Sequence, residues 1–248
     1  MIGLVENYML KRIQEEGAIH LTLIDPEKVT VKLATQVARV AESCETTALM
    51  VGGSTLISAS HLDDVVKAVK AAVEIPVILF PNNITGISKY ADAIWFMSLL
   101  NSTDPYFLDG VQILVAPLIK EIGLEAIPLG YIVVGEGGAA GVVGRACPIP
   151  YDKPELAVAH ALAAQYFGMR FVYLEAGSGA KKSVPAKMIR MVRNALEIPV
   201  IVGGGIRTGE TVKKLVRAGA NAIVTGTVTE EGNMETKIKE LTEGTRVK

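Results

Sequence analysis

Eight short runs of apolar, often β-branched residues recur along the chain, and longer amphipathic stretches separate them. Runs that are apolar throughout are typical of parallel strands covered on both faces by helices, so the pattern predicts βα units. The expected strands are His20 to Ile24, Ala48 to Val51, Val77 to Phe80, Ala93 to Met97, Pro128 to Val134, Phe171 to Leu174, Val200 to Val202 and Ala222 to Thr225.

Helical periodicity lies between these runs, and no linker interrupts it. The expected helices include 30–43, 62–73, 154–167, 185–196 and 210–218, the last ending before Gly219. Eight strands alternating with helices favour a closed (β/α)₈ TIM barrel over an open doubly wound sheet. Since such barrels commonly reach this length, we expect one domain over residues 1–248.

Two connections depart from the regular pattern. The third, residues 82–91, is short and rich in turn residues, which predicts that its helix is shortened or replaced by a loop. The fifth begins with a long glycine-rich insertion, residues 135–150, at the expected carboxyl end of a strand. This position and composition suggest a lid over the mouth of the barrel.

Charge and cysteine usage narrow the classes of function. The formal net charge is -1 and the acidic and basic residues are mixed, so a nucleic-acid binder is not indicated. Cys44 and Cys147 lack the spacing of a disulfide or zinc framework and fit a reducing compartment. No signal peptide and no spanning apolar run is evident, so we expect a soluble, cytoplasmic protein.

Glycines follow the seventh and eighth expected strands, where barrels of this class often bind phosphate. "VGGGIRTGE", residues 202–210, offers bare backbone N–H groups before a helix start, and "VTGTVTE", residues 224–230, contributes Gly226 and Thr227. Each glycine run alone also suits tight helix packing, but the two together predict a phosphate site. Arg207 could contact the anion or be solvated, and it is assigned no role.

The sixth expected strand leads into "YLEAGSGA", residues 173–180. Its loop adjoins the seventh in a closed barrel, so Ser178 and Gly179 are placed to complete the phosphate site. Glu175, with Tyr173 beside it, then faces the rest of the bound molecule and could accept a hydroxyl proton. The alternative is an ordinary strand-to-helix turn with a solvated glutamate.

The opposite rim carries a carboxylate and a hydroxyl on neighbouring strands. Asp25 ends the first strand in "LTLIDPEK", and Ser54 follows the second in "MVGGST". Each residue alone suits a helix or turn cap, but together with substrate phosphates they form a typical Mg²⁺ shell. Two anion sites, one with a metal, predict two phosphorylated substrates. The three histidines, in contrast, are interpreted as structural or surface residues.

Several stretches, in this order, resemble the geranylgeranylglyceryl phosphate synthase family across essentially the whole chain. They are "LTLIDPEK", "GGST", "FPNNITGISKYADAIWFMSLLNS", "PIPYDKPELA", "YLEAGSGA" and "VGGGIRTGE". The resemblance implies a modified TIM barrel that transfers a prenyl group from geranylgeranyl diphosphate to the C3 hydroxyl of sn-glycerol 1-phosphate. This reaction forms the first ether bond of archaeal membrane lipids.

The resemblance also implies roles for individual residues. Asp25 and Ser54 match the Mg²⁺ ligands, and Glu175 and Tyr173 are the expected catalytic residues. The glycerol 1-phosphate contacts match Tyr173, Leu174, Glu175, Ala176, Gly177, Ser178, Gly179, Gly204, Gly205, Gly226 and Thr227. One departure is Leu23, because some relatives carry a lysine at this position and any diphosphate contact it makes must be replaced or absent here.

The hydrocarbon of such a substrate needs an apolar groove. Trp95, Phe96, Tyr106 and Phe107 are candidates for its lining, with ordinary core packing as the alternative. The sequence does not fix the prenyl length, because bacterial relatives use longer chains. The resemblance suggests a homo-oligomer, either a dimer or a hexamer.

Two other functions compete with this interpretation. One is another phosphate-binding TIM-barrel enzyme, such as a sugar-phosphate isomerase or lyase, which would need no apolar groove. The other is a noncatalytic barrel that only binds a phosphometabolite and would tolerate loss of Glu175.

Overall fold

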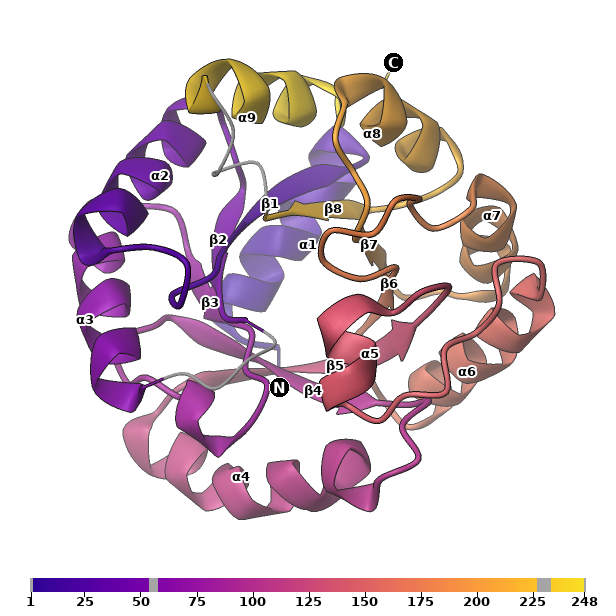
Figure 1. The fold of residues 1–248 in the computed structure, drawn as a ribbon, viewed down its shortest axis with the longest axis horizontal. Helices are drawn as coiled ribbons and strands as arrows, with labels where there is room; N and C mark the ends of the chain where they lie inside the picture. The colour runs from indigo at the N-terminus through magenta and orange to yellow at the C-terminus, as the bar shows by residue number, and fades with distance from the viewer. Residues whose placement is uncertain (1, 54–57, 227–232, 248) are drawn as a thin grey trace.

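The computed structural model describes residues 2–53, 58–226 and 233–247 and has a closed barrel of parallel strands at its centre (Figure 1). The strands follow one another in chain order, and β8 pairs with β1 to close the barrel. The predicted (β/α)₈ fold is confirmed. The strands are β1 (Ile19–Ile24), β2 (Ala48–Val51), β3 (Val77–Leu79), β4 (Ala93–Leu99), β5 (Glu125–Val133), β6 (Phe171–Glu175), β7 (Val200–Gly203) and β8 (Ala222–Thr225).

Helices surround the barrel as an outer ring (Figure 1). They are α2 (Val31–Ser43), α3 (Ala59–Lys70), α4 (Val111–Ile122), α6 (Pro154–Tyr166), α7 (Ala186–Ala195), α8 (Gly209–Arg217) and α9 (Met234–Glu243). Apolar side chains pack between this ring and the strands, and a separate apolar cluster fills the barrel interior. Gly219 adopts φ +111° just beyond α8, as expected for a helix terminator.

The third connection contains no α-helix. A single 3₁₀ turn, η1 (Ile84–Gly86), stands between β3 and β4. The Asn83 side chain caps this turn by accepting a hydrogen bond of 2.7 Å from the Thr85 N–H. The predicted replacement of the third helix is therefore confirmed, and the neighbouring helices α3 and α4 pack on β3 and β4 instead.

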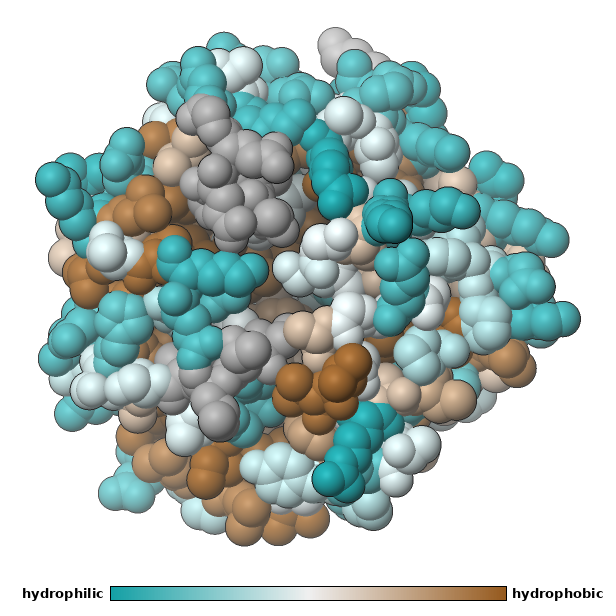
Figure 2. Space-filling model, in the orientation of Figure 1, coloured by the Kyte–Doolittle hydropathy of each residue, from teal (hydrophilic) through white to brown (hydrophobic). Residues whose placement is uncertain are grey.

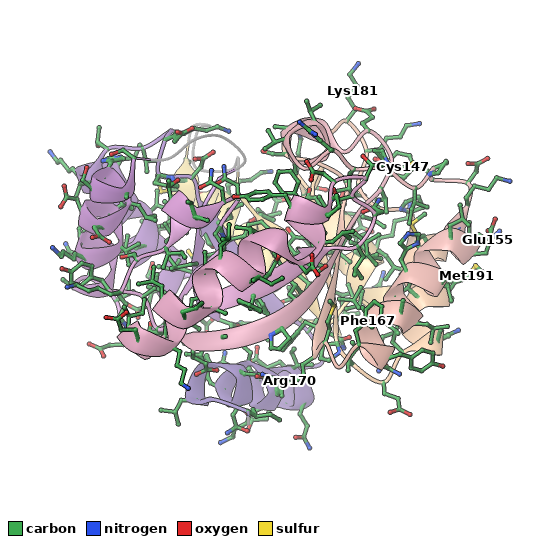
Figure 3. The ribbon with its side chains drawn as sticks, turned by 90° about the horizontal axis from the view of Figure 1, so that it is seen from below. Cys147, Glu155, Phe167, Arg170, Lys181 and Met191 are labelled. Carbon is green, nitrogen blue, oxygen red and sulfur yellow. The ribbon has the colours of Figure 1, made fainter. Side chains whose placement is uncertain are left out.

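An N-terminal helix, α1 (Leu4–Glu16), closes the end of the barrel opposite the mouth. Figure 3 shows it below the strands with Arg170 next to it, and Lys181 at the other end. The Arg170 guanidinium pairs with the buried Glu6 carboxylate, and the Glu125 carboxylate accepts hydrogen bonds of 2.9 and 2.8 Å from the first helical N–H groups. These contacts fix α1 against the strands' N-terminal ends.

The insertion 135–150 folds into a short helix, α5 (Gly138–Val143), and a following loop at the mouth. The buried Asn101 side chain donates hydrogen bonds to the Val133 and Cys147 carbonyls, at 2.8 and 2.9 Å. Ser102 Oγ bonds the Gly144 carbonyl at 2.7 Å. These contacts attach the insertion, which the sequence suggested as a lid, to the loop after β4.

No helix among the described residues is long and apolar enough to cross a membrane.

Candidate active site

Glu175 lies at the mouth of the barrel because it continues the inward-facing side of β6. Side chains alternate along a strand, and Phe171 and Tyr173 belong to the interior cluster, so Glu175 points to the same side. Its carboxylate is buried and accepts a hydrogen bond of 2.6 Å from the Gly177 N–H. The interpretation of Glu175 as a solvated turn residue is therefore wrong.

Two buried tyrosines face this carboxylate. Burial raises the pKa of Glu175, and hydrogen bonds from the Gly177 N–H and from the phenols of Tyr173 and Tyr131 partly oppose that rise. Burial and the Glu175 charge raise the pKa of both phenols well above the usual value, so they stay protonated as donors. A carboxylate with a raised pKa is a stronger base, as proton abstraction requires.

Sequence reasoning missed Tyr131. Tyr131 on β5 is the register partner of Tyr173 on β6, and their rings meet edge to face with centroids 5.2 Å apart. Phe80 stacks on Tyr173 at 5.6 Å and completes an aromatic layer beneath the carboxylate. The register of β5 and β6 pairs Tyr131 with Tyr173 and could have identified Tyr131 as a site residue. That register can be predicted only when the ends of both strands are known.

The loops after β6 and β7 touch through their backbones. Gly204 and Gly205 adopt φ +83° and +67°. A Cβ on Gly204 would lie 2.5 Å from Glu175 Oε1, and one on Gly205 would lie 2.5 Å from the Lys182 carbonyl oxygen. Only glycine tolerates both the positive φ and this close approach. Glu175, Ser178 and the glycine run of the predicted phosphate site are thereby brought together.

The eighth loop is described only in part. Gly226 follows β8 and approaches Leu23, since a Cβ at Gly226 would lie 3.4 Å from the Leu23 side chain. Thr227, the other expected phosphate contact of this loop, lies outside the described residues.

Asp25 occupies the opposite rim, at the end of β1. It accepts a hydrogen bond of 3.2 Å from the Glu27 N–H, as a turn cap would, and burial raises its pKa. A Cβ on Gly53 would lie 2.5 Å from Asp25 Oδ1, so the β2 loop passes directly over the carboxylate. Ser54 follows Gly53 but lies outside the described residues.

The few protein oxygen ligands around Asp25 suit a metal ion that is also coordinated by substrate better than one coordinated by protein side chains alone. Within residues 2–53, 58–226 and 233–247, no three His, Cys, Asp or Glu side chains gather as a ligand set. A Mg²⁺ ion commonly binds one or two carboxylates and fills its shell with water and substrate phosphates. The single carboxylate of Asp25 is sufficient for that kind of site.

One continuous pocket connects the two rims and runs over the edge of the barrel beside α4. Its polar end touches Glu175 and Ser178 on one side and Gly53 on the other. Apolar residues dominate the remainder. The lining consists of Leu23, Gly53, Phe80, Pro81, Asn82, Asn83, Ile87, Ile94, Trp95, Phe96, Met97, Leu99, Phe107, Val111, Gln112, Val115, Tyr131, Ala140, Val143, Gly144, Glu175 and Ser178.

Three of the four aromatic residues expected in the groove line this pocket: Trp95, Phe96 and Phe107. Tyr106 is not among the lining residues and packs edge-on against Phe107, with ring centroids 5.1 Å apart. Leu23, the departure from the family pattern noted in the sequence, lines the pocket. The groove passes η1, where the missing helix leaves room for it.

The molecular surface around the mouth of the barrel also has a hydrophobic side and a hydrophilic side. Figure 2 shows hydrophobic surface over α4 and α5, and hydrophilic surface over the loops that follow β6 and β7. The opening therefore offers a hydrophilic side suited to an anionic ligand and a hydrophobic side suited to an apolar chain.

Together the fold and the site define a (β/α)₈-barrel protein with a glycine-rich polar site at its mouth and an apolar groove at its side. The sequence matches the PcrB family over residues 11–245, and the chain belongs to this family.

Its relatives include the geranylgeranylglyceryl phosphate synthases of Thermofilum pendens and Pyrococcus furiosus. The first is 51% identical over 247 residues, covering 99% of this chain and 96% of the relative. The second is 54% identical over 241 residues, covering 97% and 96%. The resemblance seen in the sequence is confirmed.

Solved structures agree with these relatives. The (S)-3-O-geranylgeranylglyceryl phosphate synthase of Thermoplasma acidophilum, in complex with sn-glycerol-1-phosphate, superimposes with a TM-score of 0.95 at 42% identity and covers 99% of both chains. The wild-type enzyme of Thermoplasma volcanium gives 0.94 at 40% identity and covers 97% of this chain and 96% of that one.

Proposed function

We propose that this member of the PcrB family is a prenyltransferase that joins geranylgeranyl diphosphate to the C3 hydroxyl of sn-glycerol 1-phosphate. The products are geranylgeranylglyceryl phosphate and diphosphate. The names of the relatives support the reaction, and the sn-glycerol-1-phosphate bound to the Thermoplasma acidophilum enzyme supports the acceptor.

The observation that carries the proposal is the single pocket that joins a polar mouth to an apolar groove. Its polar end brings Glu175 and Ser178 within reach of a small phosphorylated alcohol, and the side along α4 suits a long hydrocarbon. The rim with Asp25 and Gly53, next to this pocket, is the proposed site for the diphosphate of that hydrocarbon. An isomerase or lyase acting on sugar phosphates has no use for such a groove.

Glu175 removes the proton of the attacking hydroxyl. The allylic C–O bond to diphosphate breaks as the new ether C–O bond forms, and the hydroxyl proton moves to the Glu175 carboxylate. Tyr173 and Tyr131 hold that carboxylate through their phenols, and the pocket brings the two reacting atoms together. The proposed catalytic role of Tyr173 is to hold the Glu175 carboxylate through this hydrogen bond.

Mg²⁺ is the proposed cofactor, with Asp25 and Ser54 as its protein ligands. When bound, such an ion neutralises the charge that develops on a diphosphate leaving group. The position of the Asp25 carboxylate at the end of β1, next to the β2 loop, supports this assignment. The glycerol phosphate contacts are proposed to be residues 173–179, Gly204, Gly205, Gly226 and Thr227.

We also propose that the protein is located in the cytoplasm. A further proposal is that it self-associates as a dimer or a hexamer. The exposed face of α6 supports an oligomer, because its end carries Tyr166 and Phe167, which are 79% and 75% exposed (Figure 3). Light scattering coupled to size-exclusion chromatography measures the assembly, and a monomer at micromolar concentration contradicts it.

The decisive experiment incubates the purified protein with Mg²⁺, geranylgeranyl diphosphate and each enantiomer of glycerol phosphate. We expect an ether product with the sn-1 enantiomer and little with the sn-3 enantiomer. Binding of glycerol phosphate without product in the presence of both substrates would favour the noncatalytic alternative.

A further inference from the structure

Arg207 connects the two loops that form the predicted phosphate site. It belongs to the segment between β7 and α8, and its guanidinium reaches the loop after β6. Nη1 donates a hydrogen bond of 2.9 Å to the Ala180 carbonyl, and Nη2 donates one of 3.2 Å to the Gly179 carbonyl. A planar guanidinium that binds two consecutive carbonyls fixes the orientation of both peptide groups.

The loop that Arg207 holds contains two glycines and an internal turn hydrogen bond of 3.1 Å, from the Ala180 N–H to the Gly177 carbonyl. Gly177 and Gly179 adopt φ +105° and +75°, which glycine reaches without strain but also leaves easily. The loop therefore depends on contacts from its neighbours. The Gly177 backbone packs against Gly138 of α5 on one side, and Arg207 supplies hydrogen bonds from the β7 side.

Arg207 also brings a positive charge to this side of the mouth. Both of its hydrogen-bond acceptors are neutral carbonyls, and within the described parts of the chain no carboxylate pairs with it. A bound phosphate dianion would lie in the adjoining loop, within the range of about 8–10 Å over which charges interact at ordinary ionic strength. The guanidinium thus acts on loop shape and on local potential together.

We propose that Arg207 is a positioning residue for phosphate: it holds residues 177–180 in the conformation that binds the phosphate of sn-glycerol 1-phosphate, and its charge favours the dianion. The proposal rests on the proposed function, because it names the group that prepares the acceptor site. Arg207 does not touch the reacting atoms, and it bonds the loop at Gly179 and Ala180, beyond the Gly177 N–H that orients Glu175. Its loss should therefore weaken acceptor binding more than it lowers turnover at saturation.

Two substitutions separate shape from charge. Arg207→Gln removes both, whereas Arg207→Lys keeps the charge but cannot bond two carbonyls with one planar group. Arg217→Gln is the matched control, since Arg217 ends α8 on the exposed surface. The measurements are calorimetric titration with sn-glycerol 1-phosphate and with inorganic phosphate, the Michaelis constants of both substrates, and the melting temperature.

We expect Arg207→Gln to weaken binding of sn-glycerol 1-phosphate and inorganic phosphate by roughly 10- to 100-fold, the factor typical of lost charged hydrogen bonds. Arg207→Lys should recover part of this loss, and the Michaelis constant for geranylgeranyl diphosphate should change less than about twofold. Acceptor affinity equal to that of the wild type overturns the proposal, as does an equal loss for both substrates with a lowered melting temperature. Wild-type protein that binds phosphate but not glycerol phosphate contradicts the proposed function instead, and the phosphate titrations then still test Arg207.

Discussion

The Gly177 N–H donates a hydrogen bond of 2.6 Å to Oε1 of Glu175, two residues earlier in the chain. The carboxylate is thus oriented by the same loop that is proposed to bind phosphate. Since Gly177 needs φ +105° and has no room for a side chain beside Gly138, this orientation depends on how the loop packs against α5. Substrate binding and the geometry of the base are therefore linked through one peptide group.

Glu175→Gln tests the proton acceptor. The amide oxygen can still accept the Gly177 hydrogen bond, but the side chain cannot take up a proton, so turnover should fall roughly 10²- to 10⁴-fold with little change in either substrate affinity. Steady-state kinetics and direct titration measure the two effects. Glu136→Gln, on the exposed part of the insertion, is the control. A near-normal rate with weakened glycerol phosphate binding would assign Glu175 to binding alone.

Gly204→Ala tests the contact between the β6 and β7 loops. A methyl group here would lie 2.5 Å from Glu175 Oε1, so we expect weaker acceptor binding and slower turnover, with a smaller effect on the prenyl diphosphate. Gly168→Ala is the matched control, because Gly168 also has φ +83° but nothing lies within 4 Å of its added Cβ. Both variants carry the same backbone strain, and only the first has the clash. Equal kinetic losses in the two would argue against a specific cradle.

Asp25→Asn tests the metal site. The amide keeps the shape and the turn hydrogen bond but removes the charged ligand, so Mg²⁺-dependent turnover should fall by at least about 100-fold, or about 2.7 kcal/mol of transition-state stabilisation. The barrel should remain folded, as circular dichroism can check. The rate is measured against Mg²⁺ concentration for both proteins. An unchanged magnesium dependence would remove Asp25 from the site.

Val115→Phe tests the apolar groove. Val115 lines the pocket on the inner side of α4, while its neighbour Leu114 is 64% exposed and provides the control Leu114→Phe. A larger ring at position 115 narrows the groove, so the Michaelis constant for geranylgeranyl diphosphate should rise more than that for a shorter prenyl diphosphate. The same response in both variants would place the hydrocarbon elsewhere.

His20 gives the protein an acid-sensitive core. It is buried, accepts or donates hydrogen bonds with Thr46 and Thr225 at 2.8 and 2.9 Å, and burial lowers its pKa from 6.5 to about 4. Between these values the unfolded chain binds the proton and the folded protein does not. The free energy of unfolding should therefore decrease as the pH falls through this window, by up to about 3 kcal/mol in total.

Urea denaturation at several pH values measures this loss. His20→Gln removes the titration and should flatten the profile, and His160→Gln, on α6, is the control substitution. Identical slopes for His20→Gln and the wild type would mean that other groups control acid stability.

The sequence predicted the barrel, the turn in place of the third helix, and the loops with Glu175 and Gly204, because these follow from periodicity and local chain geometry. It began the fifth strand at Pro128, yet the strand starts at Glu125, since the pairing with β4 continues past the proline. Tyr131 depends on that register, and the attachment of the insertion depends on Asn101, forty-six residues from Cys147. Such partners are set by tertiary packing, which local patterns do not contain.

The turn η1 changes how molecules can reach the mouth of this barrel. A barrel with a complete ring of helices admits ligands only along its axis, so a long chain and a small polar acceptor would compete for one entrance. Here the lining of the pocket extends to η1 and α4, at the flank of the barrel. An amphiphile lying across that flank leaves the axial entrance open. Two substrates could then arrive in either order, and a product as long as its donor could depart sideways without crossing the polar loops.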